Sequence, residues 1–169
     1  MNYDTNLLKI FQFALNQEKT GMNFFSNALN MMGIGEAVTA FKTLVAEEQK
    51  HIIFIERIIK DITQTGEVQI ETIKQETTAP SDFFTKRAQS EFLQECLQNS
   101  MVPDVTVFNT AWLIEKDISE FYGRMADKSK GRAKESFEML ADWERGHEKY
   151  FREYHDRLSR LYSDMSWGG

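Results

Sequence analysis

The sequence predicts an all-α protein: a four-helix bundle made of two antiparallel helix hairpins joined by a long crossover that contains a short helix. Apolar residues recur at steps of three and four over four long segments, which is the pattern of helices with one buried face. Glycine and proline fall between these segments, where helices are expected to end. The third observation is a repeat, because a Glu followed by a Glu-x-x-His motif occurs twice in the chain.

The first hairpin is expected to consist of helices over residues 5–32 and 36–64. Gly33-Ile34-Gly35 separates them, because glycine suits the left-handed conformation at a helix end and in a tight turn. Gly66 is expected to end the second helix. Several polar residues of that helix fall off its apolar stripe and are expected to face solvent: Glu47, Gln49, Lys50, Glu56 and Arg57.

Residues 65–103 are the least regular part of the sequence, and this stretch is too long for a hairpin loop. We therefore expect a crossover that carries the chain along the bundle from one helix pair to the other. Within it, residues 77–81 (Thr-Thr-Ala-Pro-Ser) form a break, and Ser81 or Asp82 is suited to cap a short helix that ends near Gln98.

The second hairpin is expected to consist of helices over residues 104–127 and 132–162, joined by a turn at 128–131. The third helix follows a break at Val102-Pro103-Asp104. All four helices are assigned to one domain, residues 1–169, because a chain of this length is typical of a single domain with a sizeable buried core.

Two helical turns carry the Glu-x-x-His motif, at Glu48-Gln49-Lys50-His51 and at Glu144-Arg145-Gly146-His147. A Glu and a His three residues apart lie on the same face of a helix, so both can reach a common point. Glu18 lies 30 residues before Glu48, and Glu115 lies 29 residues before Glu144. These residues interrupt the apolar stripes at matched positions in the two halves, so antiparallel packing brings them to one layer.

Any one of these residues alone would be assigned to a solvated helix face, because Glu is common in helices. Four carboxylates buried together without a cation would instead be strongly destabilising, and burial and like charges are expected to raise the pKa of all four. Carboxylates combined with imidazoles suit a transition metal such as iron or manganese. The sequence therefore predicts a site for two metal ions with six ligands: Glu18, Glu48, His51, Glu115, Glu144 and His147.

Composition argues against several other classes. The formal net charge of -6 and the pI near 5.2 are unlike those of a nucleic-acid binder. The single cysteine, Cys96, rules out a disulfide within the chain and a four-cysteine metal site, and we expect it to be a small buried hydrophobe. We see no signal-peptide pattern and no stretch of about 18 apolar residues, so we expect a cytoplasmic protein without a membrane span.

The two halves also carry a family resemblance. The segments that carry it are Glu18 with Phe25, Ala46-Glu47-Glu48-Gln49-Lys50-His51, Ile114-Glu115-Lys116 with Glu120-Phe121-Tyr122, and Glu144-Arg145-Gly146-His147-Glu148. Over nearly its whole length the chain resembles the rubrerythrin-like branch of the ferritin-like superfamily. The resemblance implies a non-haem di-iron centre, although manganese or zinc could occupy the site in the isolated protein. Its ligands would be three pairs: the bridging Glu48 and Glu144, the terminal Glu18 and Glu115, and His51 and His147, one on each iron.

The chain departs from this family pattern at two points. Classical rubrerythrins carry a rubredoxin module that supplies electrons, and a chain with one cysteine has none, so any reductase is expected to be a separate protein. Rubrerythrins also carry an extra carboxylate one turn after the third-helix ligand, where this chain has Ile118. Gly21 holds the equivalent place in the first helix and leaves room for a small oxidant or for close helix packing. Tyr122, two turns after Glu115, is expected to be a core aromatic.

The leading functional hypothesis is a rubrerythrin-like di-iron oxidoreductase that reacts with peroxide or O2 and takes electrons from an external donor. The alternatives are a protein that binds iron for storage or sensing without turnover, and a structural bundle that keeps the site as a folding clamp. We expect neither a nucleic-acid nor a membrane partner. The oligomeric state stays open, with a homodimer as one option. His155, beside the stripe of the fourth helix, is expected at the surface.

Overall fold

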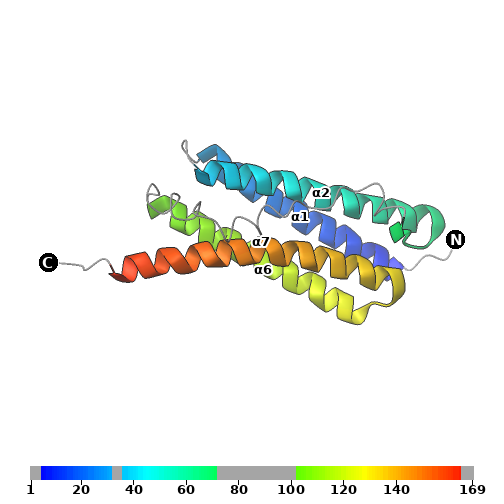
Figure 1. Cartoon of the computed structure of the whole chain (residues 1–169). Coiled ribbons are helices and arrows are strands. Elements are labelled where there is room, and N and C mark those ends of the chain that lie inside the picture. Colours follow the sequence, from blue (N-terminus) through cyan, green and yellow to red (C-terminus); the bar gives the residue numbers. More distant parts are fainter. Residues whose placement is uncertain (1–4, 32–35, 72–101, 165–169) are drawn as a thin grey trace.

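The computed structural model describes residues 5–31, 36–71 and 102–164, and within these ranges it contains helices and no strand. The four long helices are α1 (Thr5–Met31), α2 (Glu36–Thr65), α6 (Val102–Lys128) and α7 (Gly131–Asp164) (Figure 1). Among the described residues, none of the helices carries an apolar stretch of the length that a membrane crossing requires.

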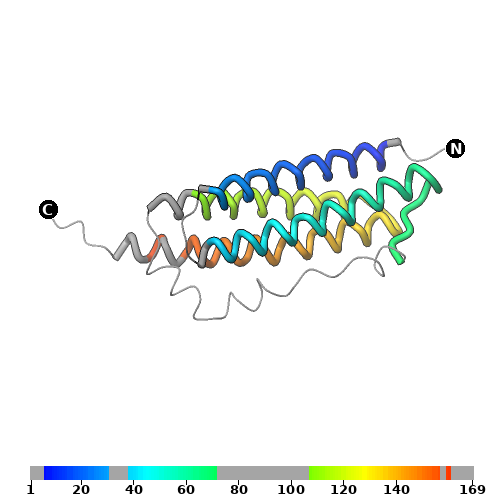
Figure 2. Tube along the Cα trace, turned by 90° about the horizontal axis from the view of Figure 1, so that it is seen from above, coloured from blue at the N-terminus to red at the C-terminus, as the bar shows by residue number. Residues whose placement is uncertain are grey.

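The helices pack as two antiparallel hairpins, α1 against α2 and α6 against α7. Figures 1 and 2 together show the square arrangement of a four-helix bundle, in which α1 lies beside both α2 and α6. α2 ends and α6 begins at opposite ends of the bundle, as the predicted crossover requires. The predicted fold class is therefore confirmed, while the short helix predicted in the crossover and the Gly33-Ile34-Gly35 turn lie outside the described residues.

The helix ends follow the positions of glycine and proline. Gly66 follows α2 with a φ of +83°, and its N–H donates to the Ile62 carbonyl (2.9 Å), which forms the glycine-capped helix end that the sequence predicted. Gly131 opens α7 with a φ of +56°. The break predicted around Pro103 is instead part of α6, which begins at Val102. Proline fits there because its missing N–H would have no partner in the first helical turn.

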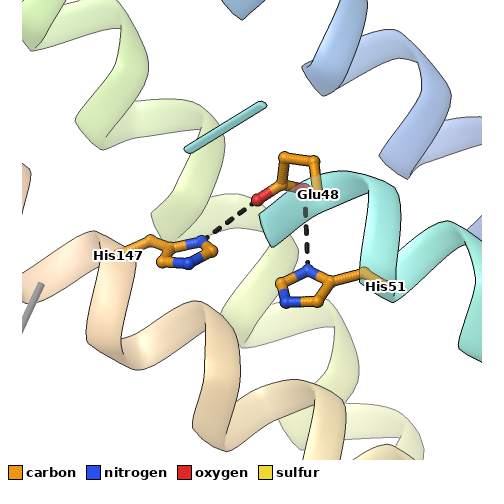
Figure 3. Close-up of side chains that lie close together, drawn as sticks. All are labelled: Glu48, His51 and His147. Carbon is orange, nitrogen blue, oxygen red and sulfur yellow. Dashed lines mark ion pairs between the residues drawn. The ribbon is translucent and has the colours of Figure 1, made fainter. Parts of the chain in front are cut away.

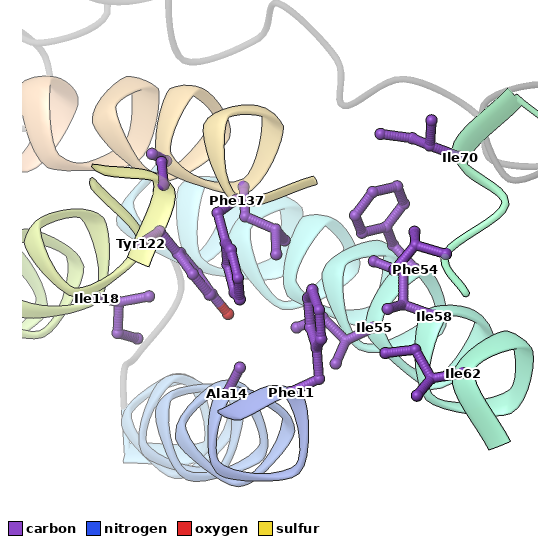
Figure 4. Close-up of a cluster of buried hydrophobic side chains, with 14 residues drawn as sticks. Phe11, Ala14, Phe54, Ile55, Ile58, Ile62, Ile70, Ile118, Tyr122 and Phe137 are labelled. Atoms are coloured by element: carbon purple, nitrogen blue, oxygen red, sulfur yellow. The ribbon is translucent and has the colours of Figure 1, made fainter. Parts of the chain in front are cut away.

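Two apolar clusters lie on either side of the Glu and Glu-x-x-His positions. In every helix, residues on one side of these positions join the first cluster and residues on the other side join the second. In the first cluster, drawn in Figure 4, Phe11 stacks on Phe137 with ring centroids 4.5 Å apart. In the second, Phe108 stacks on Tyr154 at 3.8 Å. Because both clusters are buried, the polar layer between them is closed to water from both directions.

Of the five residues of α2 that were expected in solvent, Lys50 and Arg57 are half-buried and one is buried. Glu47 was expected to face solvent, but only 3% of its surface is exposed. Its Oε1 lies 3.0 Å from the Lys50 Nζ, so its charge is paired one turn along the same helix. Position 47 lies at the edge of the buried face rather than on the outer face of the helix. Gln49 and Glu56, which were expected in solvent for the same reason, are exposed.

Candidate metal centre

Six polar side chains meet in the layer between the two apolar clusters. Each hairpin supplies three of them, one Glu from its first helix and a Glu-x-x-His pair from its second. All are buried, and none is more than 3% exposed. They are the same residues that the sequence predicted as metal ligands: Glu18 in α1, Glu48 and His51 in α2, Glu115 in α6, and Glu144 and His147 in α7.

These residues form two overlapping groups of four, each with one imidazole and three carboxylates, and Glu48 also forms a group of three with both histidines. Within a group, the candidate ligand atoms lie within 4.8 Å of one another, close enough to surround a single ion. Glu48 and Glu144 are shared by both groups. The first group is Glu18, Glu48, His51 and Glu144, and the second is Glu48, Glu115, Glu144 and His147.

Each shared carboxylate turns one oxygen toward each histidine. Glu48 Oε2 lies 3.6 Å from Nδ1 of His51, and Glu48 Oε1 lies 3.1 Å from Nδ1 of His147 (Figure 3). Glu144 Oε1 lies 2.7 Å from His51 Nδ1, and Glu144 Oε2 lies 3.4 Å from His147 Nδ1. The two imidazole rings are stacked, with centroids 5.3 Å apart. This geometry allows both carboxylates to bridge two neighbouring ions.

The other two carboxylates each approach a single histidine. Glu18 Oε2 lies 3.7 Å from Nδ1 of His51, and Glu115 Oε2 lies 3.5 Å from Nδ1 of His147. Each half of the site therefore has one unshared carboxylate and one imidazole, as the duplicated register of the sequence requires.

Apart from the two imidazoles, which are themselves candidate ligands, nearly all the carboxylate oxygens lack a hydrogen-bond donor among the described residues. Glu18 Oε1 accepts a hydrogen bond from the Tyr122 hydroxyl, whereas Glu18 Oε2 and both oxygens of Glu48, Glu115 and Glu144 accept none. Buried polar atoms are almost always paired in folded proteins, so an array of acceptors without donors calls for a cation. Carboxylate oxygen and imidazole nitrogen are ligands that first-row transition metals accept, and the residues present therefore fit such a metal.

The four carboxylates fall into two pairs by the direction in which their pKa is shifted. Burial and the neighbouring carboxylates raise the pKa of Glu18 and of Glu115 well above the ordinary value. Burial also opposes ionisation of Glu48 and Glu144, but the imidazoles beside them lower the pKa of both. Our expectation that all four values rise is therefore wrong for the two shared residues, because a histidine lies against each of their oxygens.

The two histidines hold protons strongly in the metal-free site. Burial alone would lower their pKa, but the carboxylates around them outweigh it, Glu144 and Glu48 for His51 and chiefly Glu115 for His147. The pKa of each imidazole is therefore raised well above its ordinary value of 6.5. Metal ions would replace these protons, because an imidazole must be neutral to bind a metal.

Tyr122 has a role that the sequence did not reveal. It lies in the first apolar cluster, as expected of a core aromatic, and its hydroxyl also donates to Glu18 Oε1. Burial and the neighbouring Glu18 carboxyl group raise the pKa of this phenol, so it keeps its proton. Helical periodicity indicates that a residue is buried, but it does not indicate which atom its hydroxyl contacts.

Gly21 packs closely against α6. A methyl group at this position would lie 3.6 Å from Ile114 Cγ2 and 3.6 Å from Ile118 Cδ1, which is ordinary van der Waals contact. Side chains of α6 therefore border the space that the glycine leaves, and Ile118 itself is buried. A methyl group would fit at Gly21, so close packing of α1 on α6 does not require the glycine.

Trp143 also contacts the site, and the sequence pattern missed it. Its indole stacks on the His51 imidazole with centroids 5.2 Å apart and an angle of 18° between the planes. In the sequence, the one indication that Trp143 lies near the site is its position directly before Glu144. His155 takes no part in the cluster: it stacks on Trp112, and 28% of its side chain is exposed, so it is less superficial than predicted.

A four-helix bundle whose core holds one Glu from each of two helices and a Glu-x-x-His pair from each of the others defines the ferritin-like class of carboxylate proteins. Within that class, the family model described as Rubrerythrin matches residues 9–155. The match covers most of the chain, which therefore belongs to the rubrerythrin family. No curated protein and no solved structure matches it.

Proposed function

We propose that the chain is a di-iron protein with six ligands. Glu48 and Glu144 would bridge the two irons, and each iron would be completed by one unshared carboxylate and one imidazole. The observation that carries this proposal is the overlap of the two ligand groups, which share only these two carboxylates. The pairing of the other ligands follows from the distances, Glu18 with His51 and Glu115 with His147.

The charges of the site support two divalent ions. Four ionised carboxylates carry four negative charges, which two divalent cations balance, and neutral imidazoles add no charge. In the metal-free site the raised pKa values of Glu18, Glu115, His51 and His147 place protons where the cations would lie. Metal binding would then release protons from these groups, because metal ligands must be deprotonated.

We further propose that the protein reacts with peroxide or O2, with electrons supplied by a separate donor protein. The bound irons would supply the redox chemistry. The helices would hold the six ligand side chains in place, and the two apolar clusters would keep bulk water out. The same side chains would bind the irons in both of their oxidation states. Membership of the rubrerythrin family and the deep burial of the ligands support this activity.

The test mixes the anaerobic ferrous protein with peroxide or with O2 in a stopped-flow spectrometer, with an excess of a chemical reductant. We expect rapid oxidation followed by repeated turnovers. A single slow oxidation without turnover would contradict the oxidoreductase proposal.

The second candidate function is iron storage or sensing. It is favoured by Ile118, a buried apolar side chain where rubrerythrins carry an additional carboxylate. The same stopped-flow experiment distinguishes the two functions, because storage requires oxidation of bound iron but no turnover with reductant. A purified protein that contains no metal and takes none up would exclude both functions and would favour a structural bundle.

A further inference from the structure

The Tyr122 hydroxyl breaks the symmetry of the site. It donates its hydrogen bond to Glu18 Oε1, and both side chains are fully buried. Figure 4 shows the Tyr122 hydroxyl pointing from α6 toward α1, among apolar side chains such as Phe11 and Ala14. A buried hydroxyl without a partner is destabilising, so this hydrogen bond is strongly favoured.

Among the residues that the structure describes, the other half of the site has no counterpart to this hydroxyl. In the repeat, Glu18 and Phe25 of α1 correspond to Glu115 and Tyr122 of α6, since each aromatic ring follows its Glu by seven residues. Phe25 has no hydroxyl, and among the described residues the His147 imidazole is the polar group beside Glu115, whose oxygens accept no hydrogen bond from a hydroxyl. The two unshared carboxylates therefore differ in how they are held.

This difference changes how each carboxylate can meet a metal. Tyr122 occupies one lone pair of Glu18 Oε1, so Oε2 is the oxygen of Glu18 that is left without a hydrogen bond, and it lies on the side of His51. Both oxygens of Glu115 stay available. Hydrogen bonds to a ligating carboxylate fix its orientation and tune its affinity for the metal.

We infer that Tyr122 is a positioning residue that holds Glu18 as a one-oxygen ligand, so that the two metal positions are unequal. The position next to His51 depends on the tyrosine, and the position next to His147 does not. This inference rests on the proposed di-metal function and concerns one side chain outside the ligand set.

The test compares Tyr122→Phe with the wild type and with Tyr154→Phe, which is the same substitution at another buried tyrosine. Tyr154 follows His147 by seven residues, about 10 Å along α7. The metal-free proteins are titrated with Mn²⁺ in a calorimeter, and the ⁵⁷Fe²⁺-loaded proteins are measured by Mössbauer spectroscopy. In Tyr122→Phe we expect the affinity of one metal position to fall about 10- to 100-fold and only one of two quadrupole doublets to change.

Three results would overturn the inference. If Tyr122→Phe binds both ions like the wild type and Tyr154→Phe, the hydroxyl has no positioning role and the proposed function is untouched. An equal loss at both positions, with a lowered melting temperature of the metal-free protein, would make Tyr122 a structural residue. A wild-type protein that binds no Mn²⁺ or Fe²⁺ would overturn both the inference and the proposed function.

Discussion

A carboxylate in this molecule becomes a ligand candidate through its position on the helix surface. Glu144 and Glu148 lie one turn apart in α7, but only Glu144 is fully buried and contacts both histidines. Glu148 lies off the buried stripe, where its Oε2 accepts a hydrogen bond from Ser119 Oγ (3.3 Å). The helical register accounts for this distinction, because Glu144 interrupts an apolar stripe and Glu148 does not.

The first prediction uses this pair as a matched set. Glu144→Ala removes a carboxylate that both ligand groups share, so we expect it to abolish binding at both metal positions. Glu148→Ala removes a carboxylate of the same helix outside both groups and should keep the full metal content. Elemental analysis of the two purified and metal-loaded variants makes the comparison. Equal metal content would mean that Glu144 is not a shared ligand.

At the scale of the helices, two glycines have opposite effects on the stability of the fold. Gly21 lies inside α1 with room for a methyl group, whereas Gly66 follows α2 with a φ of +83°, a conformation that residues with a Cβ rarely adopt. A glycine inside a helix lowers stability, and a glycine at a left-handed helix end raises it.

The second prediction follows from this contrast. Gly21→Ala should raise the free energy of unfolding by about 0.5–1 kcal/mol, because alanine has the higher helix propensity and meets only ordinary contacts. Gly66→Ala should lower it by about 1–2 kcal/mol, because alanine is strained at positive φ. Urea denaturation of the metal-free variants measures both changes. A destabilised Gly21→Ala would show that the space beside Ile118 is smaller than the structure indicates.

The hairpins and the burial of the six candidate ligands could be predicted because they depend on periodicity, which local sequence carries. The burial and the contacts of individual side chains could not be predicted in the same way. The burial of Glu47 depends on its place at the edge of a helix face, and the contact between Tyr122 and Glu18 joins two helices that are distant in sequence. The lowered pKa of Glu48 and of Glu144 likewise depends on where the imidazole nitrogens lie after packing.

For the whole molecule, the protonation of the buried site links stability to pH. Four groups of the metal-free protein have raised pKa values: Glu18, Glu115, His51 and His147. Such groups bind more protons folded than unfolded. They therefore stabilise the fold below their ordinary values of 4.5 and 6.5, and this contribution is lost as pH rises through the folded values. Glu48 and Glu144 act oppositely, since their contribution is lost as pH falls below 4.5.

The third prediction is that the metal-free protein is most stable in mild acid and loses stability as pH rises above 6.5. Fe²⁺ or Mn²⁺ should restore stability, most strongly at neutral and higher pH, because metal binding requires deprotonated ligands. Thermal melts of metal-free and metal-loaded protein across this range provide the measurement. A metal-induced shift in melting temperature that is the same at every pH would contradict a shared buried site.

The central claim is that Glu48 and Glu144 bridge two irons inside the bundle. It is tested most directly by anomalous diffraction at the iron edge from crystals of the loaded protein. We predict two peaks roughly 3.5–4 Å apart. Each peak should lie in contact with Glu48 and Glu144, one also beside Glu18 and His51 and the other beside the corresponding pair of the second hairpin. A single peak, no peak, or peaks outside the layer between the two apolar clusters would contradict the claim.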